Sequence, residues 1–159
     1  MFLDLEGARF ARDGGREYLF GLLTLEANGS LRDRSYWAHS DDEERVAFET
    51  VVDGILQSWE TNPGMHIYHY APYEPAAFKR LIGRYATREA EVDRMLRGER
   101  FVDLYAVVRG ALRASVERYS IKDLEPFYGF SRVVKLADAN INLSSELWKP
   151  LRSAAVLRR

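Results

Sequence analysis

The chain has no cysteine among its 159 residues, and this absence narrows the chemistry open to it. Disulfides, thiolate zinc sites and cysteine nucleophiles are excluded, so any metal ion must be held mainly by oxygen ligands. Apolar runs long enough to cross a bilayer are lacking too, and the chain begins as a strand instead of a signal region. We therefore expect a cytoplasmic protein with no membrane partner.

An excess of either charge is also lacking. The 23 basic and 24 acidic residues leave a net charge of -1, so no bulk positive field points to nucleic acid, although a local basic groove is compatible with this balance. The length and the 47% hydrophobic content suit a single domain with one core. The sequence has no Gly-rich phosphate loop and no Gly-x-Ser-x-Gly elbow, which disfavours P-loop and serine hydrolase chemistry.

The hydrophobic patterns predict an α/β protein with a mixed five-stranded sheet. Strand-like runs cover residues 1–6, 17–25, 31–38, 65–70 and 101–103. Helical patterns cover about 41–62, 75–85, 87–98, 104–114 and 120–127, with Ser40 opening a capping box and Pro75 as the first residue of its helix. Three neighbouring strands followed by strands separated by helices indicate an antiparallel part and then a parallel part, flanked by helices.

Two acids on the first strand, Asp4 and Glu6, carry the strongest chemical signal. Strand side chains alternate between faces, so both carboxylates project to one side while Leu3 and Leu5 pack on the other. Two carboxylates held this close repel each other unless a cation lies between them, and hard cations prefer oxygen ligands. The alternative is a half-exposed strand whose polar face happens to be acidic.

Two later acids have both a structural and a functional interpretation. Glu74 lies where a helix begins, so the helix dipole alone accounts for a carboxylate there. If the fourth strand runs beside the first, however, Glu74 joins Asp4 and Glu6 on one metal-binding face. Asp103 ends a short strand before a helix and is equally well explained as a helix cap or as a site residue.

Several other side chains are weaker candidates. His66 and His69 lie three residues apart in a strand, which places them on opposite faces, and His69 is the better site candidate because it ends the strand. Tyr70 and Tyr73 could stack on nucleic-acid bases, but such aromatic residues are first of all core material. Lys122 could meet a phosphate, although a lone exposed lysine is more often only solvated.

The order of these parts resembles a known family. An Asp-x-Glu strand, an acid after an aromatic residue at a helix start, and a strand ending in Asp are similar to the DEDD exonuclease branch of the ribonuclease-H-like superfamily. More closely, residues 18–21, 66–75, 87–89 and 119–129 resemble the ribonuclease-H-like domain of RecB-family nucleases. The long motif at 66–75 is specific, whereas Asp-x-Glu alone is weak. The resemblance covers residues 1–143.

The resemblance implies a magnesium- or manganese-dependent nuclease. In it, Asp4, Glu6 and Glu74 correspond to metal-binding catalytic acids of a two-metal site that hydrolyses phosphodiester bonds, as a 3′ to 5′ exonuclease on DNA or RNA. The implied partners are nucleic acid and helicase or nuclease domains of a longer parent chain. Asp103 and His69 are secondary candidates for the site.

The sequence departs from this family at its end. The fourth acid that the family carries on a late helix is missing, and only Asp138 or Glu146 could substitute for it. Residues 144–159 form an atypical basic tail, so we expect a C-terminally truncated nuclease domain that lacks the last helical segment. The alternative is a catalytically inactive module of a larger repair or helicase protein, either structural or binding nucleic acid through side chains such as Lys79, Arg80 and Lys122.

Overall fold

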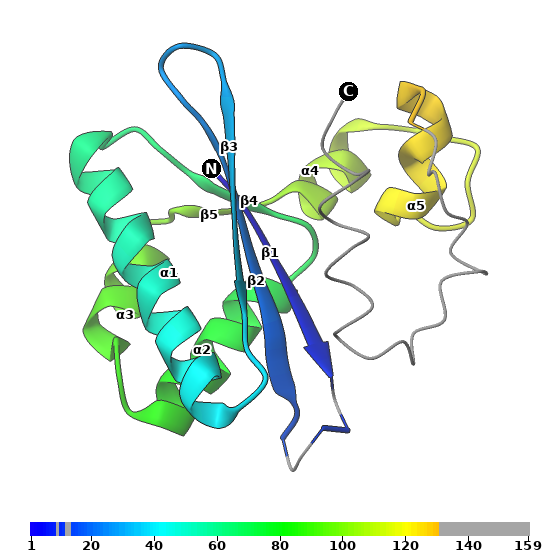
Figure 1. Cartoon of the computed structure of the whole chain (residues 1–159). Coiled ribbons are helices and arrows are strands. Elements are labelled where there is room, and N and C mark those ends of the chain that lie inside the picture. The colour runs from blue at the N-terminus through cyan, green and yellow to red at the C-terminus, as the bar shows by residue number, and fades with distance from the viewer. Residues whose placement is uncertain (9, 12–13, 131–159) are drawn as a thin grey trace. The chain divides into compact units, whose positions relative to one another are not determined.

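The computed structural model describes residues 1–8, 10–11 and 14–130, in two compact units (Figure 1). The first unit is Met1–Ala114, and the second begins at Ser115. The elements of the first unit are β1 (Phe2–Ala8), β2 (Arg16–Leu25), β3 (Leu31–Trp37), α1 (Asp41–Thr61), β4 (Ile67–His69), α2 (Tyr73–Tyr85), α3 (Glu89–Arg97), β5 (Phe101–Asp103) and α4 (Leu104–Ala111).

The five strands form one mixed sheet in the order β3-β2-β1-β4-β5. The pairs β1·β2 and β2·β3 are antiparallel, while β1·β4 and β4·β5 are parallel. Hairpin loops join the antiparallel strands, and helices supply the longer crossovers that parallel neighbours require. The predicted fold, with its antiparallel part followed by a parallel part, is confirmed. Strand β1 lies at the centre.

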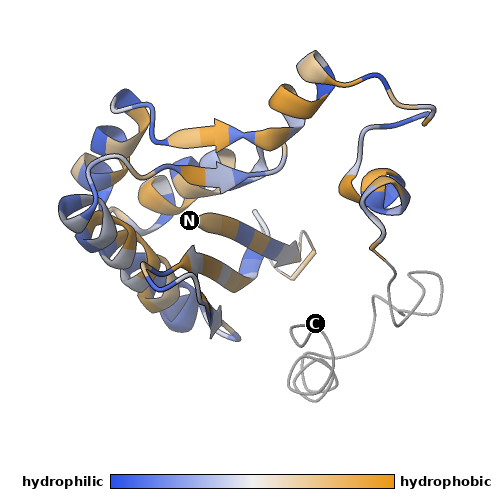
Figure 2. Ribbon diagram, turned by 90° about the horizontal axis from the view of Figure 1, so that it is seen from above, coloured by the Kyte–Doolittle hydropathy of each residue, from blue (hydrophilic) through white to orange (hydrophobic). Residues whose placement is uncertain are grey.

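Helices α1, α2 and α3 cover one face of this sheet (Figures 1 and 2), which we call the covered face. Leu3 and Leu5 of β1 point into this core, whereas Phe2, Asp4 and Glu6 are exposed on the other side, which we call the open face. This alternation follows from the two-residue period of a strand. Most of the core comes from one buried cluster, whose larger members are Phe20, Leu22, Phe48, Val51, Val52, Ile55, Ile67, Phe78, Leu81, Val92 and Met95.

In the first unit, the predicted helix boundaries are mostly close, with two corrections. Ser40 caps α1 as predicted, because its hydroxyl accepts a hydrogen bond from the Glu43 N–H at 3.2 Å. Helix α2, in contrast, begins at Tyr73, so Pro75 is its third residue and not its first. The first helical N–H groups have no partner within a helix, so a proline there loses no hydrogen bond. Helix α4 ends at Ala111, short of the predicted 114.

The described part of the second unit contains two short elements. They are α5 (Ile121–Leu124) and the 3-10 helix η1 (Glu125–Tyr128), which together replace the single helix predicted over 120–127. The Ser120 hydroxyl caps α5 by accepting from the Asp123 N–H at 3.3 Å. In the portion of the chain that the structure describes, no helix is long and apolar enough to cross a membrane.

Candidate functional site

Asp4 and Glu6 lie on the open face of the central strand, where solvent reaches both side chains. The burial of Leu3 and Leu5 fixes this orientation, because a slip of one residue would expose both leucines. Gly21 lies opposite Asp4 in the β1·β2 pairing. Since glycine has no side chain, residue 21 adds none beside Asp4 on the open face. The predicted same-side placement of the two carboxylates is present in the structure.

The strand pairing changes directly after Glu6. Glu6 pairs with Leu19, but Gly7 pairs with Glu17, so Tyr18 is an extra residue in β2. Such a β-bulge bends the strand and interrupts the alternation of side chains. Without it, Glu17 would share a face with Leu19. With it, Glu17 lies opposite Gly7 and points toward α2 on the covered face.

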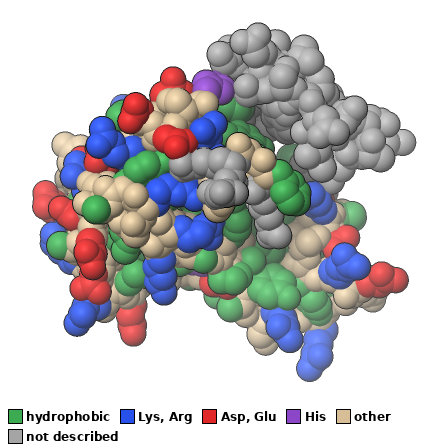
Figure 3. Space-filling view, turned by 90° about the horizontal axis from the view of Figure 1, so that it is seen from below, with side chains coloured by type: hydrophobic (Ala, Val, Ile, Leu, Met, Phe, Trp, Pro, Cys, Tyr) green, Lys and Arg blue, Asp and Glu red, His purple; other side chains and the backbone are tan. Residues whose placement is uncertain are grey.

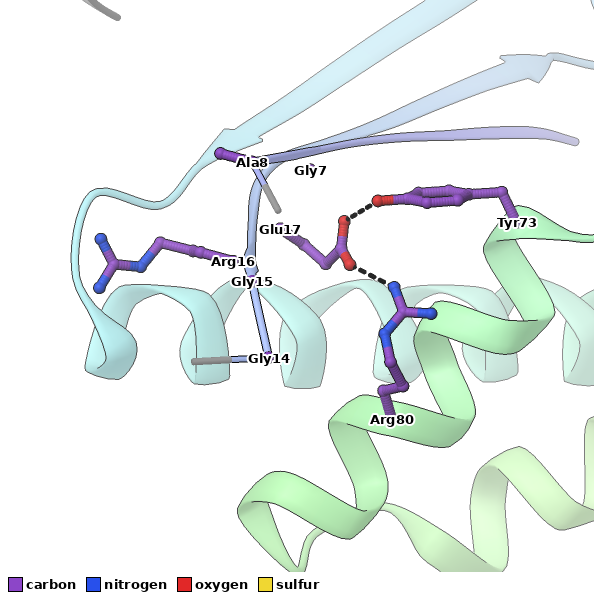
Figure 4. A pocket seen from close by; sticks show the side chains of 8 residues that line it. All are labelled: Gly7, Ala8, Gly14, Gly15, Arg16, Glu17, Tyr73 and Arg80. Carbon is purple, nitrogen blue, oxygen red and sulfur yellow. Dashed lines mark hydrogen bonds and ion pairs between the residues drawn. The ribbon is translucent and has the colours of Figure 1, made fainter. Parts of the chain in front are cut away.

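Glu17 is the centre of a small pocket at this end of β1, with a volume of about 290 Å³ (Figure 4). The Tyr73 hydroxyl donates a hydrogen bond to Glu17 Oε2 at 2.7 Å, and Arg80 Nη2 donates to Glu17 Oε1 at 2.6 Å. The Arg80 guanidinium also lies 5.6 Å from the centre of the Tyr73 ring. Burial, and then the hydrogen bond to Glu17, raises the pKa of Tyr73 well above its ordinary value. Tyr73 therefore stays protonated and acts as the donor.

Glu74 is buried, and its carboxylate lies beside His69 and not beside Asp4 and Glu6. Its Oε2 lies 3.6 Å from Nδ1 of His69, and both side chains are at most 5% exposed. His69 lies two residues after Ile67, a core residue of the same strand, so both point to the covered face. The contact between His69 and Glu74 is therefore on the covered face. Burial by itself would lower the pKa of His69, but Glu74, the Ala71 carbonyl and Asp103 outweigh it, and the pKa is raised overall. The imidazole Nδ1 lies 2.7 Å from the Ala71 carbonyl oxygen.

The predicted three-carboxylate face is therefore not assembled by the described residues. Asp4 and Glu6 share the open face, while Glu74 contacts His69 on the covered face. Across residues 1–8, 10–11 and 14–130, no group of three or more His, Asp and Glu side chains is arranged to hold a metal ion. The physical reason lies in α2, whose first turn packs Glu74 onto the end of β4 instead of past the edge of β1. Asp138, Glu146 and the tail at 144–159 lie outside the described residues.

The remaining candidates are placed as follows. Asp103 caps α4, since its Oδ1 accepts from the Tyr105 N–H and also from the Ala71 N–H, both at 2.9 Å. Strand β4 pairs with β1 as expected, but His66 precedes the strand. The Tyr70 ring packs edge-on against Tyr105, with their centres 5.7 Å apart. Lys122 is exposed on α5 in the second unit.

The two carboxylates of the open face fit a hard divalent cation in their donor chemistry. Mg²⁺ is commonly bound through one or two carboxylates, with waters and substrate phosphates completing its coordination. Asp4 and Glu6 provide two such carboxylates. A second ion would need more ligands than the described residues bring to this face.

The surface around this end of the sheet carries both signs of charge. Figure 3 views the molecule from below, the side where the loop between β1 and β2 lies, and shows basic and acidic side chains interspersed. Arg80 is 44% exposed at the rim of the pocket, and Lys79 beside it is exposed too. Local cations are thus present near Glu6 without a broad basic surface.

Comparison with known proteins agrees with this fold class, a mixed sheet of the ribonuclease H type with acids on its central strand. A model of the family RNase_H_2, described as RNase_H superfamily, matches residues 1–153. The chain belongs to this family of the RNase H superfamily. Neither the curated proteins nor the solved structures contain a match to it.

Sequence reasoning did not single out Gly7, Glu17 or Gly21 as parts of the site. Gly7 directly follows the Asp-x-Glu motif. A glycine at that position could have indicated that another side chain packs closely against the backbone there. Glu17 looked like an ordinary polar residue at a strand start, because the bulge that turns it inward has no local signature. Its burial depends on Tyr73 and Arg80, both more than 50 residues away.

Proposed function

We propose that this chain is a metal-dependent nuclease domain in which Asp4 and Glu6 hold Mg²⁺ or Mn²⁺ for the hydrolysis of phosphodiester bonds. The observation that carries this proposal is the pair of exposed carboxylates on the central strand of an RNase H superfamily sheet. Members of this superfamily typically use divalent metal ions. Among the family's activities, we propose 3′ to 5′ exonuclease action on DNA or RNA, as the resemblance to DEDD exonucleases implies.

The residues of the open face have distinct roles in this proposal. Asp4 and Glu6 would bind the cation, which when bound supplies an activated water and stabilises the leaving oxygen. Gly21 leaves room beside Asp4 for the scissile phosphate. Arg80 lies outside the open face, at the pocket rim, where its exposed part would add only salt-dependent affinity for the polyanionic strand, without sequence preference.

Glu74 has a separate place in this account. Its Oε2 is buried and has no hydrogen-bond partner at normal length, which is costly for a carboxylate and often marks a functional group. The proposal therefore keeps Glu74 as a third acid of the site, as the resemblance to DEDD exonucleases implies. The variant Glu74→Gln tests this role separately from that of Asp4.

The test is digestion of end-labelled single-stranded DNA and RNA with Mg²⁺, with Mn²⁺ and with EDTA. We compare the wild-type chain with Asp4→Asn and with the control Asp33→Asn. Asp33 is an exposed acid on the open face of β3, two strands from β1, so its change matches Asp4→Asn in charge. The proposal predicts metal-dependent cleavage that Asp4→Asn lowers at least 100-fold and Asp33→Asn leaves within twofold.

Label position then decides the polarity. A 3′-to-5′ exonuclease releases a 3′ label as mononucleotide at once, and it shortens a 5′-labelled strand stepwise. Cleavage of a circular strand would exclude exonuclease action while leaving the nuclease proposal intact.

A second candidate function is binding of nucleic acid without hydrolysis. It is favoured by the lack of a third ligand grouped with Asp4 and Glu6 in the described residues. In this case no metal-dependent cleavage occurs, and Asp4→Asn strengthens binding because repulsion of phosphate is reduced. Gel-shift titration of the same labelled strands distinguishes the two candidates.

A further inference from the structure

The structure contains a hydrogen-bonded group that joins the start of β2 to the first two turns of α2. It consists of Tyr73 in the first turn of α2, Glu17 at the start of β2, and Arg80 two turns along α2 (Figure 4). We call these three residues the Glu17 clamp. Both oxygens of Glu17 are used, one by the Tyr73 hydroxyl at 2.7 Å and one by Arg80 at 2.6 Å. The Glu17 side chain is only 6% exposed, so these contacts are largely shielded from water.

The Glu17 clamp packs closely against Gly7, the residue that follows Glu6. A methyl group added to Gly7 would overlap both the Tyr73 hydroxyl oxygen and Glu17 Oε2. Only a glycine permits this approach. The clamp therefore packs against the main chain of Gly7 at the point where the β1·β2 pairing shifts between Glu6 and Gly7. This bulge turns Glu17 of β2 inward, so that its carboxylate lies against Gly7, the direct backbone neighbour of Glu6.

The same tyrosine directly precedes Glu74 in the sequence. Tyr73 thus contacts the backbone next to Glu6 and lies in the turn of α2 that carries the third proposed acid. We propose that Tyr73 is a positioning residue for the metal site, holding Glu6 in the orientation that binds the cation. This inference rests on the proposed function, since it assumes that Asp4 and Glu6 bind a divalent ion. Residues that orient metal ligands in this way typically contribute 10- to 100-fold in metal affinity.

The chain offers a closely matched control for this role. Tyr85, at the other end of α2, donates its hydroxyl to Oε2 of the buried Glu44, which Arg84 also contacts at 3.0 Å. Tyr73 and Tyr85 therefore make the same kind of bond to a buried glutamate that an arginine shares. Only the Tyr73 bond lies against Gly7.

The test is direct titration of Mn²⁺ into the metal-free chain by calorimetry, together with thermal melts without metal. The variants are Tyr73→Phe, Tyr85→Phe and Asp4→Asn. We expect Tyr73→Phe to raise the Kd for Mn²⁺ about 10-fold, while Tyr85→Phe keeps it within twofold and Asp4→Asn abolishes binding. Both tyrosine variants should lower the melting temperature, because each loses one buried hydrogen bond.

The outcomes separate this inference from the proposed function. Equal Kd values for the wild type, Tyr73→Phe and Tyr85→Phe, with binding lost in Asp4→Asn, would overturn the positioning role and leave the metal site standing. A wild-type chain that binds no Mn²⁺ would overturn both. If Tyr73→Phe does not fold, Gly7→Ala is measured in its place, because the added methyl displaces the Tyr73 hydroxyl. Unchanged Mn²⁺ affinity in a folded Gly7→Ala chain would contradict the inference equally.

Discussion

The two faces of the sheet use acidic residues in opposite ways. On the covered face, Glu17, Glu44 and Glu74 are buried, and each lies against a basic side chain: Arg80, Arg84 and His69 respectively. On the open face, Asp4 and Glu6 are exposed on the central strand. A buried charge is tolerated only with partners, whereas an exposed pair is accessible to an ion from solvent. We infer that Glu17 and Glu44 hold the fold together, and our proposal assigns the chemistry to the exposed acids, with Glu74 as a third.

The largest predicted effect is on the covered face. Glu44 is 0% exposed, and it accepts from Arg84, from Tyr85 and from the Glu17 main-chain N–H at 2.5 Å. Glu44→Ala leaves the Arg84 charge without its partner, so the free energy of unfolding should fall by about 3–5 kcal/mol. Urea denaturation measures this fall. The control Glu60→Ala changes an exposed acid of the same helix and should cost less than about 0.5 kcal/mol. Similar losses in both variants would contradict the comparison.

The next effect concerns the open face and its ion. Mn²⁺ at 100 times its Kd should raise the free energy of unfolding of the wild-type chain by about 2.7 kcal/mol, because only the folded chain holds Asp4 and Glu6 together. Asp4→Asn should show no such gain, whereas Glu44→Gln should keep it. The measurement is the urea midpoint with and without Mn²⁺. A gain in Asp4→Asn equal to that of the wild type would place the ion elsewhere.

A smaller effect depends on pH and on the pair of His69 and Glu74. Because the folded chain raises the pKa of His69, the protonated imidazole stabilises the fold below its ordinary pKa of about 6.5. This contribution is lost as the pH rises through the raised value. The stability difference between the wild type and His69→Gln should therefore be greater at pH 5.5 than at pH 8.5, as measured by urea denaturation. Equal differences at the two pH values would show that His69 is not charged beside Glu74.

The smallest predicted effect lies at the helix cap of α1. Ser40→Ala removes the acceptor for the Glu43 N–H and should cost about 1 kcal/mol of stability. Nuclease activity should not change, because the cap is remote from the open face of β1. A thermal melt and the digestion assay together check both parts. Loss of cleavage in a chain that is still folded would connect this helix end to the site.

Much of the fold could be predicted because its signals are local. The alternation of Leu3 and Leu5 with Asp4 and Glu6 and the Ser40 cap each depend on neighbouring residues only. From these signals follow the antiparallel part of the sheet and the helices that flank it. The start of α2 was misplaced by two residues, because a proline is tolerated anywhere in the first turn of a helix.

The site could be predicted only in part. Asp4 and Glu6 were found because the strand period alone fixes their shared face. Glu74 was expected beside them, but the packing of α2 determines which neighbour it meets, and the structure places His69 there. The Glu17 clamp could not be foreseen at all, since it joins residues of β2 and α2, more than 50 positions apart, through one bulge.

The most direct test of the account measures activity and stability together in Asp4→Asn and Glu44→Gln. The assay is single-turnover cleavage of a 3′-labelled single strand with Mn²⁺, at a temperature where both variants are folded. We predict that Asp4→Asn loses at least 100-fold in rate and keeps its melting temperature within about 2 °C, a shift of under 1 kcal/mol for a domain of this size. Glu44→Gln should lose stability and keep its rate. An Asp4→Asn chain that cleaves as fast as the wild type would contradict the assignment of the open face as the site of chemistry.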